Sequence, residues 1–190
     1  MADKPTYLGL LNAIAQAETR AHAYLAAWVA VTPDPAVRAV LQTVAAREGE
    51  HGMSFAKRIN ELGFEVREDD DPNFERRMEI AGSDRSDLDK LEALQLLRFR
   101  SDDEPDIFDN MFRDHSIDIQ TGALLGRYIA EERDTLRLLQ GCCAQLQSGS
   151  AGTSPGDRLA VVEDKIDAVS RAVDELRQIV CAQAMPTSSV

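Results

Sequence analysis

Apolar residues recur at spacings of three and four along four long stretches of the chain, a pattern that places them on one face of an α-helix. The first stretch runs from about residue 6 to residue 31, and the second from residue 35 to about residue 62. Asp34 followed by Pro35 is typical of a helix start, because the aspartate caps free backbone N–H groups and proline fits the first helical position. So short a connection predicts an antiparallel helical hairpin.

The pattern is weaker between residues 64 and 116. The acidic segment 65–72 indicates a solvated loop, and Ser86 with an acid three positions later predicts the start of a short helix that reaches Leu97. We therefore interpret this region as a long crossover, which lets the chain return to the end of the bundle where it started.

A third long helix is expected from about residue 116 to residue 147, which completes a bundle domain over residues 1–147. Residues 148–154 are rich in serine and glycine and indicate a flexible linker. Residues 155–190 begin with a strict heptad register, which predicts a coiled-coil-type helix before a frayed tail. This helix packs either as the fourth helix of the bundle or against another copy of the chain. Its heptad positions are Leu159, Val162, Ile166, Val169, Val173, Leu176 and Val180.

Charge and cysteine usage narrow the classes of function. The chain has 33 acidic and 21 basic residues and a net charge of −12, which disfavours binding to nucleic acids and to anionic membranes. No apolar run approaches the ~20 residues that a membrane-spanning helix needs, and the first residues lack the pattern of a secretion signal. The three cysteines include no Cys-x-x-Cys pair. We expect a cytoplasmic protein without a disulfide framework.

The most informative motif is Glu48-x-x-His51 in the middle of the second helix. Its two side chains leave the helix on one face about one turn apart. They also lie within the apolar stripe, between Val44 and Phe55, and burying a carboxylate and an imidazole there is costly unless each has a partner.

Glu18 interrupts the apolar stripe of the first helix in the same way. Glu18 and Glu48 each lie 15 residues from Pro33 in the turn, so both lie at the same depth, roughly 22 Å from it at ~1.5 Å per residue. The two carboxylates are therefore expected to meet His51 inside the hairpin. A divalent cation would neutralise the repelling carboxylates, and oxygen and imidazole ligands suit iron, manganese or zinc.

Further candidates lie near this predicted site. Glu132 is on the inner face of the third helix at a central height and is a candidate fourth ligand, although its neighbour Glu131 is an alternative inward residue. His22, one turn after Glu18, and Tyr128 are candidates for hydrogen bonds to the ligands, with ordinary packing as the alternative. The vicinal pair Cys142–Cys143 is interpreted as helix packing.

A helix with Glu18, followed 30 residues later by Glu-x-x-His on an antiparallel helix, resembles half of a ferritin-like or rubrerythrin-like di-iron carboxylate bundle. The resemblance covers about residues 6–63 and extends more loosely over residues 116–147. It implies that Glu18, Glu48 and His51 are ligands of iron, as one ion or two. It also implies oxidation of Fe²⁺ or chemistry with oxygen or peroxide.

The second half of the chain departs from the family pattern. The residue three positions after Glu132 is Thr135 instead of histidine, and the position 30 residues before Glu132 is Asp102, near Pro105. The site then holds one metal, or two metals with an incomplete ligand set, or is completed across a dimer.

Three functional hypotheses remain open. The first is an all-α, ferritin-like iron protein that forms a dimer or higher homo-oligomer and draws on an external electron donor. The second is a non-catalytic helical interaction protein with a structural Glu/His cluster. The third is a di-iron hydroxylase of an organic substrate, which requires an apolar pocket beside the metals.

Overall fold

The computed structural model describes residues 4–97 and 114–150, and this part of the chain is all-helical. The all-α prediction is confirmed for these residues. The chain divides into two compact units, residues 1–146 and 147–190, and the contacts given below lie in the first. The predicted heptad helix, Asp102 and residues 151–154 of the predicted linker lie outside the described residues. None of the helices searched in the described part has an apolar stretch that can span a membrane.

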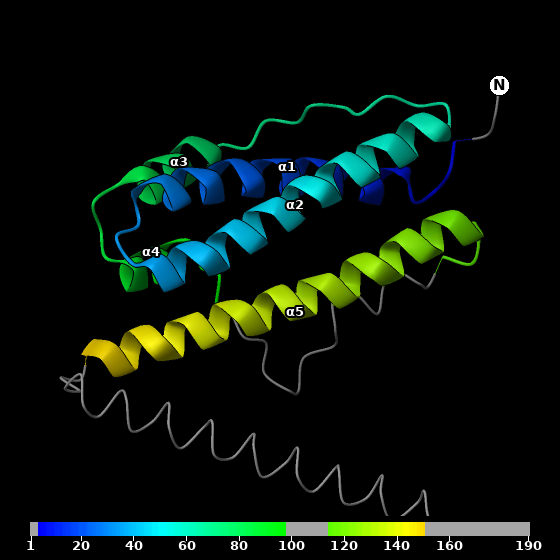
Figure 1. Ribbon diagram of the computed structural model, residues 1–190. Coiled ribbons are helices and arrows are strands. Elements are labelled where there is room, and N and C mark those ends of the chain that lie inside the picture. The colour runs from blue at the N-terminus through cyan, green and yellow to red at the C-terminus, as the bar shows by residue number, and fades with distance from the viewer. Residues whose placement is uncertain (1–3, 98–113, 151–190) are drawn as a thin grey trace, which may run out of the picture. The chain divides into compact units, whose positions relative to one another are not determined.

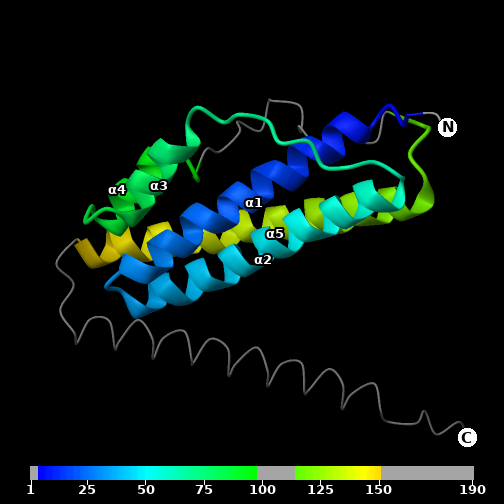
Figure 2. The same cartoon turned by 90° about the horizontal axis from the view of Figure 1, so that it is seen from above.

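The predicted hairpin consists of helices α1 (Leu8–Val31) and α2 (Pro35–Glu61), which lie side by side and antiparallel (Figures 1 and 2). The turn ends as the sequence predicts, because Oδ1 of Asp34 accepts a 2.8 Å hydrogen bond from the backbone N–H of Ala36. At the other end of α2, Gly63 adopts a positive φ of 84°, a conformation that glycine permits without strain. Helix α2 therefore has a defined start and a defined end.

Two glycines of α2 let the helices of the hairpin approach closely. A Cβ atom added at Gly52 would lie 2.6 Å from Oγ1 of Thr19 and 3.1 Å from its backbone nitrogen. A Cβ atom at Gly49 would lie 2.9 Å from Nδ1 of His22. Because α1 and α2 are nearly in backbone contact here, side chains on their facing surfaces reach one another at the same depth.

The crossover begins with an extended segment that runs back along α1 (Figures 1 and 2). Asn12 and Gln16 bind this segment, since the side-chain oxygen of Asn12 accepts from the backbone N–H of Arg67 at 2.7 Å and that of Gln16 accepts from Asp69 at 2.8 Å. The acidic loop predicted over residues 65–72 is therefore present, and hydrogen bonds from its backbone to side chains of α1 hold it in place.

Two short helices follow, α3 (Phe74–Gly82) and α4 (Asp87–Ala93), and both lie at the turn end of the hairpin (Figures 1 and 2). The apolar pattern does not predict α3, because its nine residues bury only Ile80 and Ala81. The predicted extension of the second short helix to Leu97 is wrong, since the chain turns at Gln95, where φ is 57°. The predicted serine cap is present, because Ser86 Oγ accepts from the backbone N–H of Asp89 at 3.1 Å.

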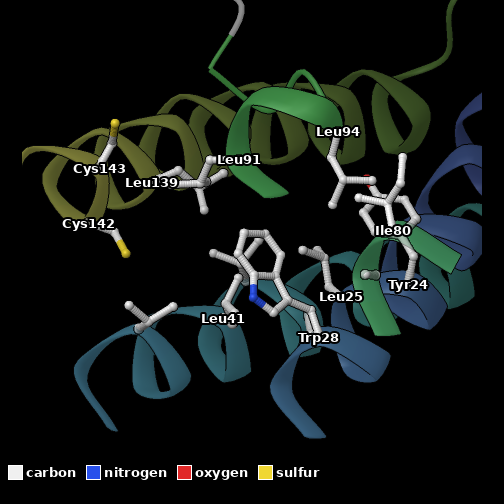
Figure 3. Close-up of a cluster of buried hydrophobic side chains, with 14 residues drawn as sticks. Tyr24, Leu25, Trp28, Leu41, Ile80, Leu91, Leu94, Leu139, Cys142 and Cys143 are labelled. Carbon is white, nitrogen blue, oxygen red and sulfur yellow. The ribbon is translucent and has the colours of Figure 1, made fainter. Parts of the chain in front are cut away.

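A buried aspartate joins α4 to the end of α1. Asp87 accepts hydrogen bonds from the indole nitrogen of Trp28 at 2.6 Å and from the hydroxyl of Thr32 at 2.8 Å. Figure 3 shows Trp28 in the middle of the surrounding apolar cluster, which the crossover helices and the third long helix complete. Cys142 and Cys143 are buried free thiols in this cluster, as the packing interpretation expects.

The third long helix, α5 (Ile119–Ser150), runs along the hairpin (Figures 1 and 2). It begins three residues later than predicted because Asp118 caps it, accepting from the backbone N–H groups of Gln120 and Thr121 at 3.0 Å each. Residues 148–150, predicted as linker, continue the helix, since extending an existing helix adds a hydrogen bond for each residue fixed. The inner face of α5 packs on α1 and α2 in a second apolar cluster, which includes Leu125, Tyr128 and Ile129.

Candidate metal centre

Four side chains from three helices meet between the two apolar clusters. Glu18 comes from α1, Glu48 and His51 from α2, and Glu132 from α5. Each offers one potential ligand atom, and these four atoms all lie within 4.8 Å of one another, so the group can hold a metal ion. The structure thus brings together all four residues that the sequence singles out as candidate ligands.

These side chains are removed from solvent to different degrees. Glu18, Glu48 and His51 expose only 6%, 5% and 3% of their surfaces, whereas the side chain of Glu132 is 23% exposed. The buried atoms Oε2 of Glu18, Nδ1 of His51 and Oε1 of Glu132 have no hydrogen-bond partner among the described residues. Three unpartnered atoms that face one another are the donor set that a bound cation would satisfy.

The ring of His51 has a different environment at each nitrogen. Nε2 lies 2.7 Å from Oε2 of Glu131, whereas Nδ1 lies 3.5 Å from Oε1 of Glu132 and 3.8 Å from Oε2 of Glu18. The edge-to-face contact with Tyr128, at 5.0 Å between ring centroids and 81° between planes, further restricts the ring. Nδ1 is thus the nitrogen that faces the candidate ligands.

Glu131 and Glu132 both turn toward His51, but they contact opposite sides of its ring. The sequence leaves open which of the two faces inward, because successive helical residues point about 100° apart and either can lie on the inner face. Only Glu132 belongs to the cluster of four ligand atoms. The contact of Glu131 with Nε2 is a feature that the apolar pattern does not reveal.

Tyr128 and His22, the two further candidates, have different partners. The hydroxyl of Tyr128 donates a 2.9 Å hydrogen bond to Oε1 of Glu18, so it contacts a candidate ligand directly. His22 instead places Nδ1 2.6 Å from the backbone oxygen of Ala45 and packs against Gly49. Its contacts given by the structure therefore belong to the α1–α2 interface.

Arg47, which belongs to none of the sequence motifs described above, connects α2 to α5 beside the cluster. It donates hydrogen bonds to the backbone oxygen of Glu131 at 3.1 Å, to the Thr135 hydroxyl at 3.0 Å and to Asp134 Oδ2 at 3.0 Å. Thr135 stands where the family pattern has a histidine, and its buried hydroxyl serves this contact between helices. The position therefore supports the site structurally.

Burial and mutual repulsion split the pKa values of the two most buried carboxyl groups. Burial, the contact with Glu18 and the charge of Glu18 together raise the pKa of Glu48 to about 11. Burial also disfavours ionisation of Glu18, but its interactions with His51, Glu48 and Tyr128 outweigh that effect and lower its pKa. Without a metal, this pair therefore shares one proton at neutral pH.

The carboxylates also favour a charged His51. Burial opposes protonation of the ring, but contacts with Glu132, Glu18 and Glu131 outweigh it and raise the pKa of His51 to about 10. The metal-free cluster thus holds protons on Glu48 and His51 at neutral pH. A divalent cation would displace them and supply positive charge at the same place.

No family model, no curated protein and no solved structure matches this chain.

Proposed function

We propose that the chain is a ferritin-like iron protein, with Glu18, Glu48, His51 and Glu132 as the metal ligands. The proposed activity is oxidation of Fe²⁺ or reduction of peroxide. The observation that carries the proposal is the convergence of unpartnered buried donor atoms from α1, α2 and α5.

The three unpartnered atoms are costly to the folded protein as long as no cation is bound. Each buried polar atom without a hydrogen bond lowers the stability of the fold by about 1–3 kcal/mol. Such atoms are rare in native proteins, and here three of them lie in one cluster. A cation bound between Glu18, His51 and Glu132 would provide each atom with a partner. The cluster also lies where three helices contact one another, so these elements hold the donors in place before an ion arrives.

The donor types favour iron and allow manganese or zinc. Three carboxylates and one imidazole form an oxygen-rich set with a single nitrogen, which suits divalent ions of intermediate hardness. Bound iron would supply one-electron redox chemistry beside the carboxylates. Each Fe²⁺ oxidised releases one electron, and reduction of hydrogen peroxide to two water molecules consumes two electrons and two protons. Two Fe²⁺ ions are therefore oxidised for each peroxide.

The residues of the chain have separate tasks in this proposal. Glu48 and His51 exchange their protons for the metal, and Tyr128 holds the Oε1 side of Glu18 so that Oε2 faces the cluster. The sequence contains no Cys-x-x-Cys motif for an iron–sulfur electron carrier. Repeated reduction of peroxide, without a supply of fresh Fe²⁺, would therefore need electrons from an external reductant.

A second candidate is a non-catalytic helical interaction protein. The raised pKa values of Glu48 and His51 favour it, because protons on these two groups already neutralise part of the buried negative charge. In that case the cluster is a structural network and the same helices form without a metal.

Metal content separates the two candidates. The protein is purified without chelators, loaded anaerobically with Fe²⁺ and freed of excess metal before elemental analysis. We expect stoichiometric iron in the wild-type protein and its loss in Glu48→Gln and His51→Asn. Glu50→Gln is the matched control, because Glu50 is next to the cluster in sequence but its side chain is 53% exposed. A fully helical wild-type protein that retains no iron would favour the interaction protein.

Catalysis is tested on the loaded protein. Formation of Fe³⁺ is followed after addition of oxygen or hydrogen peroxide, with Glu50→Gln again as the control. A rate no faster than that of free Fe²⁺ would contradict the proposed activity while leaving metal binding intact. Consumption of an added organic substrate would instead support the hydroxylase hypothesis.

A further inference from the structure

The two ring nitrogens of His51 have different surroundings, and this difference affects how a metal would bind. Nε2 has a close partner in Oε2 of Glu131 at 2.7 Å. Nδ1 has no hydrogen bond to the described part of the chain and faces the carboxylates of Glu132 and Glu18 at 3.5 and 3.8 Å. Since a neutral imidazole binds a cation through one nitrogen while the other carries hydrogen, the position of that hydrogen decides which nitrogen is free.

Glu131 is itself held in position. Its Oε1 atom accepts a 3.0 Å hydrogen bond from Nε of Arg127, and its backbone oxygen accepts a 3.1 Å hydrogen bond from Arg47. Arg127 also pairs with Glu50 on α2. The carboxylate of Glu131 thus gives one oxygen to Arg127 and the other to His51, so its orientation is fixed from both sides.

Glu131 does not belong to the ligand group. Its Oε2 atom contacts the nitrogen of His51 on the far side of the ring from Glu18 and Glu132. The four potential ligand atoms within 4.8 Å of one another come from other residues. Its effect on a bound ion therefore has to pass through the imidazole.

We propose that Glu131 is a positioning residue for the metal, because it accepts the Nε2–H of His51 and so keeps the Nδ1 lone pair directed at the ion. This inference rests on the proposed metal-binding function. A carboxylate in this place fixes the tautomer, restricts rotation of the ring and raises the basicity of the ligating nitrogen. The edge contact with Tyr128 restricts the same ring from another side.

Zn²⁺ is the probe, because it is diamagnetic and shares the ligand preferences of the site. Its dissociation constant is measured by competition with a chromophoric chelator for the wild-type protein and for Glu131→Ala, Glu131→Gln and Glu92→Gln. We expect Glu131→Ala to weaken binding about 10- to 100-fold. Glu131→Gln retains an oxygen that accepts from Nε2–H, so its loss should be smaller. Glu92→Gln removes an equal charge from an exposed side chain of α4, away from Arg127 and His51, and should match the wild type.

Nuclear magnetic resonance of ¹⁵N-histidine-labelled protein provides a second measurement, which a merely structural role would not change. In the Zn²⁺-bound wild-type protein, His51 should show a slowly exchanging Nε2–H proton and a metal-bound Nδ1. In Glu131→Ala, that proton should exchange faster and its resonance should move upfield, while the far-ultraviolet circular dichroism remains that of the wild type.

The outcomes separate this inference from the function on which it depends. Absence of Zn²⁺ and Fe²⁺ binding by the wild-type protein would overturn both. Binding by the wild type with equal affinity in Glu131→Ala, Glu131→Gln and Glu92→Gln would overturn only the role of Glu131, and so would a metal bound to Nε2. Graded weakening in the order Ala, Gln, wild type, together with Nδ1 coordination, is the result that we expect.

Discussion

The hydroxyl of Tyr128 donates a 2.9 Å hydrogen bond to Oε1 of Glu18, so a residue of α5 and a residue of α1 meet in the interior although 110 positions separate them. This bond satisfies one oxygen of a carboxylate whose other oxygen has no hydrogen-bond partner within residues 4–97 and 114–150. It therefore links the packing of α5 on α1 to the candidate metal centre.

Removal of this hydroxyl is the first prediction. Tyr128→Phe leaves a second buried oxygen of Glu18 without its hydrogen bond, and we expect the free energy of unfolding of the metal-free protein to fall by about 1–3 kcal/mol. Urea denaturation measures the change. Tyr24→Phe is the control. Tyr24, on α1, is buried as Tyr128 is, but its hydroxyl has no hydrogen bond to another described residue. Equal losses in the two variants would contradict the assignment.

The close approach of α1 and α2 makes a second prediction. In Gly52→Ala the new methyl group would meet Thr19 Oγ1 at 2.6 Å and the Thr19 backbone at 3.1 Å, so the helices must separate. We expect a loss of about 1–3 kcal/mol in the free energy of unfolding. Gly126→Ala is the matched control, because it also lies within a helix but has open space around it. That control should be neutral or gain up to about 1 kcal/mol.

A third prediction concerns acid. Hydrogen bonds from Thr121, Tyr7 and Arg58 outweigh the effect of burial and hold the pKa of Asp118 well below its ordinary value. A depressed pKa in the folded state stabilises the protein above the unfolded pKa of about 3.9, and this contribution is lost as the pH falls toward the folded value.

Asp118→Asn removes that titration. Urea denaturation of both proteins should show a gap in the free energy of unfolding that is fully present at neutral pH and narrows below about pH 4. Asparagine still accepts hydrogen bonds at the start of α5, so the helix itself should remain. A gap of constant size across the acid range would show that the charge of Asp118 does not matter.

A fourth prediction concerns the metal itself. An ion that binds only the folded protein stabilises it by about 2.7 kcal/mol at a free concentration 100 times its dissociation constant. We expect anaerobic Fe²⁺ to raise the thermal midpoint of the wild-type protein and a chelator to reverse the rise. His51→Asn should show no such shift. An equal shift in both proteins would indicate binding elsewhere.

The meeting of Glu18, Glu48 and His51 is predictable because both helices are regular and the turn between them is short. A constant rise per residue then places equal chain distances at equal depths. The capped starts at Asp34 and Ser86 are predictable for a similar local reason, since each depends on a side chain bonding to a backbone group nearby.

The contact between Glu131 and His51 could not be predicted in this way. It depends on the rotation of α5 about its own axis relative to α2, and a long crossover separates these helices, so no local rule fixes that angle. Helix α3 could not be predicted either, because its nine residues are too few to show the helical period of apolar positions and only two of them are buried. Whether the convergent side chains bind a metal remains a prediction.

The short turn of the hairpin also determines which changes in chain length the molecule can accept. One residue inserted within α1 or α2 between the turn and the cluster would rotate the far part of that helix by about 100° and advance it by about 1.5 Å. Either Glu18 or the Glu48–His51 pair would then leave the interior. An insertion among residues 32–34 leaves both helices intact. In chains that share this hairpin, length variation should therefore concentrate in the turn, while the number of residues from each carboxylate to its end of the helix stays constant.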